Sequence, residues 1–307
     1  MRSLALSAGL LLVVSAAAAP FAQTPEATSL FGKPLVSAPP TGEQKTRLEA
    51  DLAKAQAEYD RNASSADAAI WLGRRLAYLG RFNDAIQLYT RGIAAHPAEA
   101  RLYRHRGHRY ITIRKFDLAI ADLRRAAELT AGRPDEIEPD GAPNRAGIPR
   151  STLQSNIWYH LGLAQYLSGD FNAALASYRE GMKVSRVNDD MLVATSDWLY
   201  MTLRRLGRES DAKQVLDPIR EQMDILENQA YHARLLMYKG VRTPESVLNL
   251  NTADDVQIAT QGYGVGNWYL VNGDKARARE IFERILGGRA WTAFGYIAAE
   301  ADLKRGI

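Results

Sequence analysis

Residues 72–97 read LGRRLAYLGRFNDAIQLYTRGIAAHP and decide the fold of this 307-residue chain. The first half spaces leucines at 72, 76 and 79, which places them along one face of a helix. Gly80 suits the left-handed residue that closes a helix, and an apolar period of 3.6 resumes at Ala85. Helical geometry is disfavoured in the residue before Pro97, so the second helix ends there. The stretch therefore predicts two short helices joined by a tight turn.

The same spacing of glycine and alanine residues recurs along the chain. Gly73 and Ala85 are repeated 34 residues later as Gly107 and Ala119, and a third copy begins at Trp158. This period and these residues resemble the tetratricopeptide repeat, a helix–turn–helix unit of about 34 residues. One unit cannot bury its own apolar face, so it needs neighbours stacked on it. The resemblance implies an all-α, right-handed solenoid that mediates protein–protein or protein–peptide interaction.

The repeats divide most of the chain into helix pairs. We expect a solenoid over residues 41–307, with five to six pairs between capping helices. The predicted boundaries are 66–99, 100–131, 153–188, 192–222, 226–258 and 259–290, followed by a C-terminal cap helix at 291–304. Residues 132–152 interrupt the pattern with four prolines and three glycines. Such insertions form loops on one face of a solenoid, often the binding face.

The N-terminal residues have the composition of a secretory signal peptide. Arg2 precedes an apolar run up to residue 19, which is short for a membrane span of about 20 residues. Cleavage after Ala19 or after Ala22 fits the small-residue rule. We expect residues 1–19 to be removed and the protein to be periplasmic or secreted, with no stable membrane span. Five prolines within residues 20–40 predict a flexible spacer. An uncleaved membrane anchor is the alternative.

Composition and motifs narrow the function classes. The net charge of +4 is modest for this length and does not argue for a nucleic-acid partner. Glycines 262, 264 and 266 follow no strand-like segment, so they do not predict a dinucleotide loop. His105 and His108 lie one turn apart, but a zinc site needs further ligands and the chain has no cysteine. We expect no enzyme activity, no cofactor and no bound metal.

A basic stretch supplies the candidate binding residues. Residues 66–131 contain twelve lysines and arginines against six acidic residues. In proteins of the resembled family, the first helix of each repeat lines the concave face. The residues that this pattern places there are Arg74, Arg101, Arg104, His105 and His108. Arginine binds carboxylates through paired hydrogen bonds, so the pattern favours a protein or peptide partner of acidic character. A solvated face without a ligand is the alternative.

The insertion has the opposite charge. Its acidic residues are Asp135, Glu136, Glu138 and Asp140, with no basic residue between Pro134 and Asn144. A loop of 21 residues is long enough to cross the concave face. We hypothesise that it partly occupies the arginine groove and competes with an acidic ligand. Two alternatives stay open, namely a loop that contacts the partner itself and a solvated loop with no role.

These observations together predict a function. We expect an exported scaffold or adaptor for protein–protein interaction in the bacterial cell envelope. One alternative is a non-catalytic subunit of a larger envelope complex. Another is an enzyme scaffolded on the repeats, but the longest non-repeat piece, at residues 132–152, is short for a catalytic domain.

Overall fold

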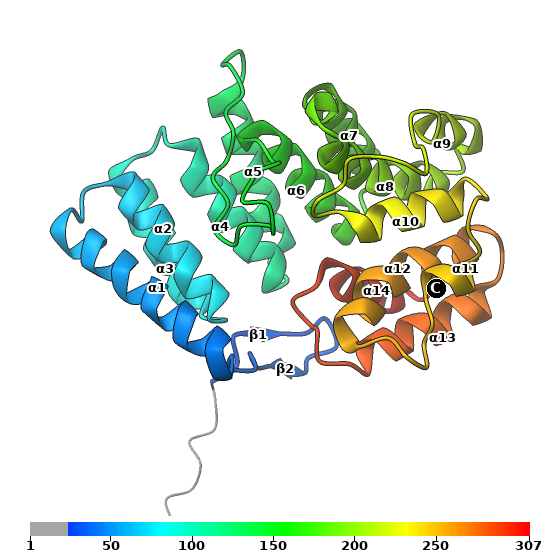
Figure 1. Ribbon diagram of the computed structural model, residues 1–307, viewed down its shortest axis with the longest axis horizontal. Coiled ribbons are helices and arrows are strands. Elements are labelled where there is room, and N and C mark those ends of the chain that lie inside the picture. Colours follow the sequence, from blue (N-terminus) through cyan, green and yellow to red (C-terminus); the bar gives the residue numbers. More distant parts are fainter. Residues whose placement is uncertain (1–23) are drawn as a thin grey trace, which may run out of the picture.

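The computed structural model describes residues 24–307, whose helices follow one another in a curved row (Figure 1). Six helix pairs make up the row. They are α2 (Ala66–Tyr78) with α3 (Phe82–Ala95), α4 (Ala100–Thr112) with α5 (Phe116–Thr130), α6 (Leu153–Ser168) with α7 (Phe171–Val184), α8 (Asp189–Arg205) with α9 (Glu209–Val215), α10 (Gln229–Tyr238) with α11 (Pro244–Val247), and α12 (Asp255–Val271) with α13 (Lys275–Leu286). A short 3-10 turn, Ser185–Val187, links α7 to α8. The predicted all-α solenoid is confirmed.

The glycines of the repeat allow the two helices of a pair to approach closely. A side chain at Gly73 would have its Cβ 2.3 Å from the ring of Tyr89, and one at Gly107 would lie 2.8 Å from Leu123. Both distances are far below van der Waals contact. Each glycine on the first helix therefore receives a large side chain from the second, as the spacing predicts. Most buried side chains of successive pairs form one core that extends from Leu35 to Ala299, and a small second cluster contains Ala100, Ala126 and Ile157.

The turns inside the pairs share one geometry. In each, a residue with positive φ is followed by a residue whose N–H donates to the carbonyl five positions earlier, as in the bond from Arg81 to Leu76. This is the bond that closes a helix through a left-handed residue. The left-handed residues are Gly80, Arg114, Gly169, Gly207, Gly240 and Gly273. Arg114 is the only non-glycine residue with positive φ within 24–307, and glycine is the residue that takes this conformation without strain.

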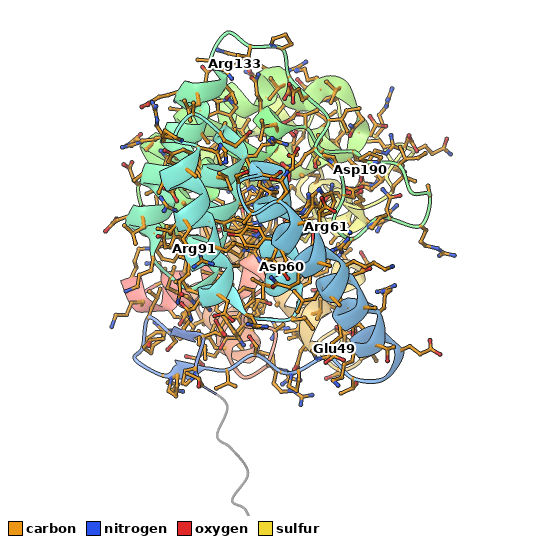
Figure 2. The ribbon with its side chains drawn as sticks, turned by 90° about the vertical axis from the view of Figure 1, so that its left-hand side faces the viewer. Glu49, Asp60, Arg61, Arg91, Arg133 and Asp190 are labelled. Atoms are coloured by element: carbon orange, nitrogen blue, oxygen red, sulfur yellow. The ribbon has the colours of Figure 1, made fainter. Side chains whose placement is uncertain are left out.

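Helix α1 (Gly42–Arg61) covers the N-terminal end of the row. It packs beside α2, yet it contains no buried residue. Figure 2 shows Glu49, Asp60 and Arg61 along its outer surface. A polar outer face of this kind is typical of the capping helix of a solenoid.

The predicted flexible spacer is wrong for residues 24–40, which form an ordered segment that we call the N-terminal strap. It contains a small hairpin of β1 (Ala27–Thr28) and β2 (Pro34–Leu35). The backbone of the strap binds the C-terminal part of the chain. The backbone N–H of Leu30 donates to Glu300 at 2.7 Å, and Trp291 donates to the carbonyl of Val36 at 2.9 Å. These distant partners satisfy backbone groups that a free Pro-rich segment would leave to water. Figure 1 shows the strap running between the N-terminal and C-terminal helices.

The last helix is also not the cap that the sequence predicts at 291–304. Helix α14 (Phe294–Arg305) lies against α12, α13 and α6, and its residues 295–302 are all buried. Small residues make this approach possible, because a Cβ at Gly295 would lie 2.0 Å from the carbonyl oxygen of Ala259. The C-terminal helix therefore fills part of the inner side of the curved row rather than covering its end.

The insertion at 132–152 is an ordered loop. Ile137 forms an isolated antiparallel bridge with Thr152, and the loop is anchored to the next repeats by Arg150, whose guanidinium lies 2.6 Å from Asp224. The predicted signal peptide at 1–19 lies outside the described residues. Within the described part of the chain, no helix is long and apolar enough to cross a membrane.

Candidate functional site

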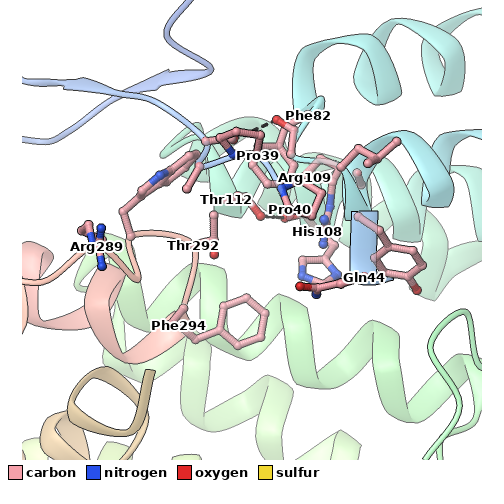
Figure 3. Close-up of a pocket in the computed structure, with 18 of the residues that line it drawn as sticks. Pro39, Pro40, Gln44, Phe82, His108, Arg109, Thr112, Arg289, Thr292 and Phe294 are labelled. Atoms are coloured by element: carbon pink, nitrogen blue, oxygen red, sulfur yellow. Dashed lines mark hydrogen bonds between the residues drawn. The ribbon is translucent and has the colours of Figure 1, made fainter. Parts of the chain in front are cut away.

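Two adjoining cavities lie on the inner side of the first two repeats. The outer chamber has a volume of about 650 Å³, and Figure 3 shows His108 and Arg109 facing Phe294 and Arg289 across it. The inner chamber has a volume of about 120 Å³. The chambers share the lining residues Ala77, Tyr78, His108 and Arg109. They therefore adjoin one another, with these four residues between them.

The inner chamber is built from three helices and the insertion. Arg74 and Tyr78 come from α2, Tyr89 comes from α3, and Glu138 comes from the insertion. Helix α4 supplies Arg104, His105, His108 and Arg109. Positions three and four apart share one face of a helix, which is why 74 and 78, and likewise 105 and 108, line the same chamber.

The carboxylate of Glu138 occupies one side of the inner chamber. Its Oε2 lies 3.1 Å from Nε of Arg104 and accepts a hydrogen bond from Asn156 at 3.1 Å. Its Oε1 lies 3.7 Å from Nε2 of His105. Only 5% of the Glu138 side chain is exposed. An acidic side chain of the protein's own loop is thus bound among the arginines.

The backbone of the same loop lies directly on α2. The carbonyl of Gly141 accepts a hydrogen bond from Arg75 at 2.7 Å. A Cβ at position 141 would lie 2.1 Å from the hydroxyl of Tyr78 and 2.8 Å from the guanidinium of Arg74. The absent side chain at Gly141 therefore lets the loop cover the inner chamber closely.

Other polar groups of the inner chamber have no partner. Arg74 and Arg109 form no ion pair or side-chain hydrogen bond with any residue in 24–307, and the same part of the chain offers no hydrogen bond to the hydroxyls of Tyr78 and Tyr89 or to the ring of His108. Tyr89 is nevertheless only 1% exposed. Buried polar groups normally have hydrogen-bond partners. Of the five side chains only Tyr89 is buried, and the other four are partly exposed. Arg74 and Arg109 lie over the rings of Trp71 and Phe82, at 4.6 and 5.6 Å from the ring centres. The five side chains therefore keep hydrogen-bond donors available to a ligand or to water around one small volume.

The chamber is positively charged at neutral pH. Burial, together with the arginine neighbours, lowers the pKa of His105, His108 and His160 well below the usual value, so these imidazoles are neutral. Burial also lowers the pKa of Arg109 to about 10. This pKa is still well above neutral pH, so the guanidinium keeps its charge. The lining therefore contains three charged arginines and one carboxylate, that of Glu138.

Part of the outer chamber is apolar. Its walls include Pro39 and Pro40 of the strap, Phe82 at the start of α3, and Trp291 and Phe294 before and within α14. The ring of Phe294 lies 5.3 Å from that of His108, measured between centroids. A cavity of this size with apolar walls and a few convergent polar groups has the character of a ligand site.

The structure gathers four of the five predicted groove residues. Arg74, Arg104, His105 and His108 line the inner chamber. Arg101 does not, which corrects that prediction. Its guanidinium lies 2.6 Å from Asp67 and 2.7 Å from Glu99, so it is neutralised near the N-terminal ends of α2 and α4.

The four acidic residues of the insertion lie in different environments. Glu138 enters the chamber. Asp135 instead accepts hydrogen bonds from Thr152 and the backbone of Gln154 at the start of α6, and Glu136 is exposed. Asp140 is half-buried, and burial raises the pKa of its carboxyl despite the nearby charge of Arg74. Only one of the four carboxylates is therefore bound by the arginines.

Sequence reasoning missed Tyr78, Tyr89, Arg109 and the wall at 289–294. Tyr89 occupies an aromatic position that the repeat pattern assigns to the core, and its ring does pack there. Tyr89 is nevertheless one of the residues that line the inner chamber. The repeat period gives no signal for Arg109, because the equivalent residue one repeat earlier, Arg75, does not line the chamber and pairs with Asp51 instead. Within residues 24–307, no group of three histidine or acidic side chains could hold a metal ion.

The fold and the site define a helical-repeat solenoid with a cationic cavity on its inner side. Residues 155–188, which cover most of the α6–α7 pair, match the family model of the tetratricopeptide repeat. The chain is therefore a helical-repeat protein that contains a tetratricopeptide repeat, as the sequence predicts. A search of curated proteins finds no match.

Solved structures with similar folds include several tetratricopeptide-repeat proteins. MamA from AMB-1 is 21% identical, with a TM-score of 0.42, over 56% of this chain and 88% of that chain. YrrB, described as a TPR protein with an unusual peptide-binding site, is 12% identical, with a TM-score of 0.43, over 76% and 91%. TTC0263, a thermophilic TPR protein of Thermus thermophilus, is 18% identical, with a TM-score of 0.46, over 62% and 92%.

Proposed function

We propose that this protein is an interaction scaffold that binds an acidic segment of a protein partner in the cavity between α2, α4 and α14. The observation that carries the proposal is the pair of arginines, Arg74 and Arg109, which face a cavity without a carboxylate partner in the described residues. Both arginines are partly exposed, and their guanidinium groups lie over the rings of Trp71 and Phe82 rather than against a carboxylate. A partner carboxylate would supply that pairing through hydrogen bonds of the charged type. Glu138 illustrates the chemistry, because the neighbouring Arg104 already binds it.

Partner capture tests this proposal. The Arg74→Gln/Arg109→Gln variant is expected to lose a partner that the wild-type protein captures from a cell-envelope extract at low salt. Salt should also release the partner from the wild-type protein, because screening weakens contacts between charges. Captured proteins would be compared by mass spectrometry.

Arg124→Gln is the matched control for this experiment. Arg124 is an exposed arginine on α5 that forms no ion pair within 24–307. Its replacement changes the net charge in the same direction without touching the cavity, so capture should be retained. Capture of the same proteins by the double variant and the wild type would contradict the proposal.

We further propose that the protein acts in the bacterial cell envelope after export. The proposal is supported by the charge, apolar run and small residues at positions 1–22. Mature protein from the native cells is expected to begin at Pro20 or Gln23, as read by N-terminal sequencing of the envelope fraction. Protein that starts at Met1 and stays in the cytosolic fraction would contradict this setting.

A further inference from the structure

The inner chamber presents hydrogen-bond donors from several directions toward a volume of about 120 Å³. The donors are the guanidinium groups of Arg74 and Arg109, the hydroxyls of Tyr78 and Tyr89, and the ring of His108. One water molecule takes up about 30 Å³ of the liquid. The chamber is thus large enough for a compact group of a few non-hydrogen atoms.

The charge of the chamber narrows the class of that group. Arg74, Arg104 and Arg109 supply three positive charges, and Glu138 supplies one negative charge. With neutral imidazoles, these four side chains leave an excess of two positive charges, which the nearby carboxylate of Asp140 offsets in part at Arg74. A phosphate group carries between one and two negative charges at neutral pH and has three strong acceptor oxygens. It matches both the excess charge and the number of donors better than a single carboxylate does.

We propose that the inner chamber binds a phosphate group, and that the outer chamber holds the organic body to which this group is attached. The inference rests on the proposed function, because the same cavity is used, and it specifies which anionic group enters deepest. The walls formed by Phe82, Trp291 and Phe294 suit an aromatic or other apolar body next to the phosphate. Glu138 occupies part of the chamber lining and neutralises Arg104, so it reduces both the volume and the positive charge available to the anion.

The Tyr89→Phe variant of the full chain gives the sharpest test. The change removes only a hydroxyl, which forms no hydrogen bond with the described residues, and keeps the ring that packs against Gly73. Its stability without ligand is therefore expected to equal that of the wild type. Its affinity for inorganic phosphate should fall by about tenfold, since hydrogen bonds to a charged group are of the stronger kind. Calorimetric titration at constant ionic strength measures both proteins.

Arg109→Gln gives an independent test, because this variant is expected to be more stable than the wild type while it binds phosphate more weakly. Arg109 is half-buried and its charge is repelled by those of Arg104 and Arg74, so its removal should raise the midpoint temperature of the phosphate-free protein. The same change should weaken phosphate binding by more than about tenfold. A purely structural arginine would lower the midpoint temperature when replaced, so this result separates a ligand-binding role from a packing role.

Three further probes identify the source of the anion. Phenyl phosphate should bind more tightly than inorganic phosphate if the aromatic wall of the outer chamber holds the body. Succinate should bind more weakly than phosphate. Sodium chloride at matched ionic strength should produce no specific stabilisation. Tighter binding of succinate than of phosphate, or equal phosphate binding by wild type and Arg109→Gln, would overturn the proposal.

The two proposals can fail separately. If phosphate does not bind but the Arg74→Gln/Arg109→Gln variant still loses its protein partner, the phosphate site is wrong and the scaffold function stands. If phosphate binds as expected and partner capture is unchanged in that variant, the chamber binds phosphate and the partner binds elsewhere.

Discussion

Replacing Glu300 with alanine is expected to lower the free energy of unfolding by about 3–5 kcal/mol, the cost of leaving a buried charge unpaired. Glu300 lies on α14, and its Oε2 is 2.9 Å from Nε of Arg114 in the turn between α4 and α5. The two side chains are only 1% and 2% exposed. Alanine would strand the guanidinium in the interior, and it would also remove the acceptor of the Leu30 backbone N–H.

Arg114 makes this contact from a left-handed backbone conformation, which is strained for a residue other than glycine. It occupies the left-handed turn position where the other pairs have glycine, with φ of 64°. Its guanidinium also donates to the carbonyls of Thr112 and Trp291, at 2.6 and 2.9 Å. One side chain therefore ties the second repeat to the wall of the outer chamber and, through Glu300, to the strap. Loss of Glu300 should consequently loosen the cavity as well as destabilise the chain.

Urea unfolding measures the effect, and hydrogen exchange at the Leu30 amide locates it. Glu283→Ala is the matched control, because Glu283 pairs with Arg279 on the exposed surface of α13. Its cost should stay below about 1 kcal/mol. The Arg114→Gly/Glu300→Leu variant should be more stable than Glu300→Ala, since it removes both charges and restores the glycine of the other turns. A Glu300→Ala variant as stable as the control would show that the buried pair does not hold these segments together.

Local sequence periodicity predicted the parts of this structure that depend on neighbours along the chain. The 34-residue spacing located the paired helices, and Gly73 and Gly107 lie where a large side chain of the second helix needs room. The repeat spacing also identifies the ionic partner of Arg101, because Asp67 lies 34 residues, one repeat, before Arg101. Stacked repeats place equivalent positions side by side, so this ion pair was predictable and excludes Arg101 from the cavity.

Contacts between distant segments could not be predicted in this way. The strap binds Glu300 across 270 positions of sequence, and no local pattern specifies which remote helix covers a Pro-rich segment. Tyr89 shows a second limit. The repeat pattern correctly assigns its ring to the core, but a core tyrosine that lines a cavity and one that does not have the same signature in a single sequence. The site thus depends on tertiary packing more than the fold does.

The position of Glu138 leads to the second large effect. Its carboxylate lies beside the inner chamber, where it neutralises Arg104 and repels an incoming anion. Two like charges about 8 Å apart repel by roughly 2 kcal/mol at the effective dielectric constant of a protein site, about 20. Glu138→Gln should therefore increase the affinity for phosphate, and for an acidic partner, by about tenfold or more.

The stability of the same variant should move in the opposite direction. Without the carboxylate, Arg104 is left buried without an ionic partner, so the ligand-free Glu138→Gln protein should unfold at a lower urea concentration. Added phosphate should then restore more stability to the variant than to the wild type, because tighter binding stabilises the folded state more. Glu136→Gln, an exposed change two residues away in the same loop, should alter neither affinity nor stability. Weaker binding by Glu138→Gln would instead show that the loop contacts the ligand or positions its donors, and an unchanged affinity would show that the loop has no role in binding.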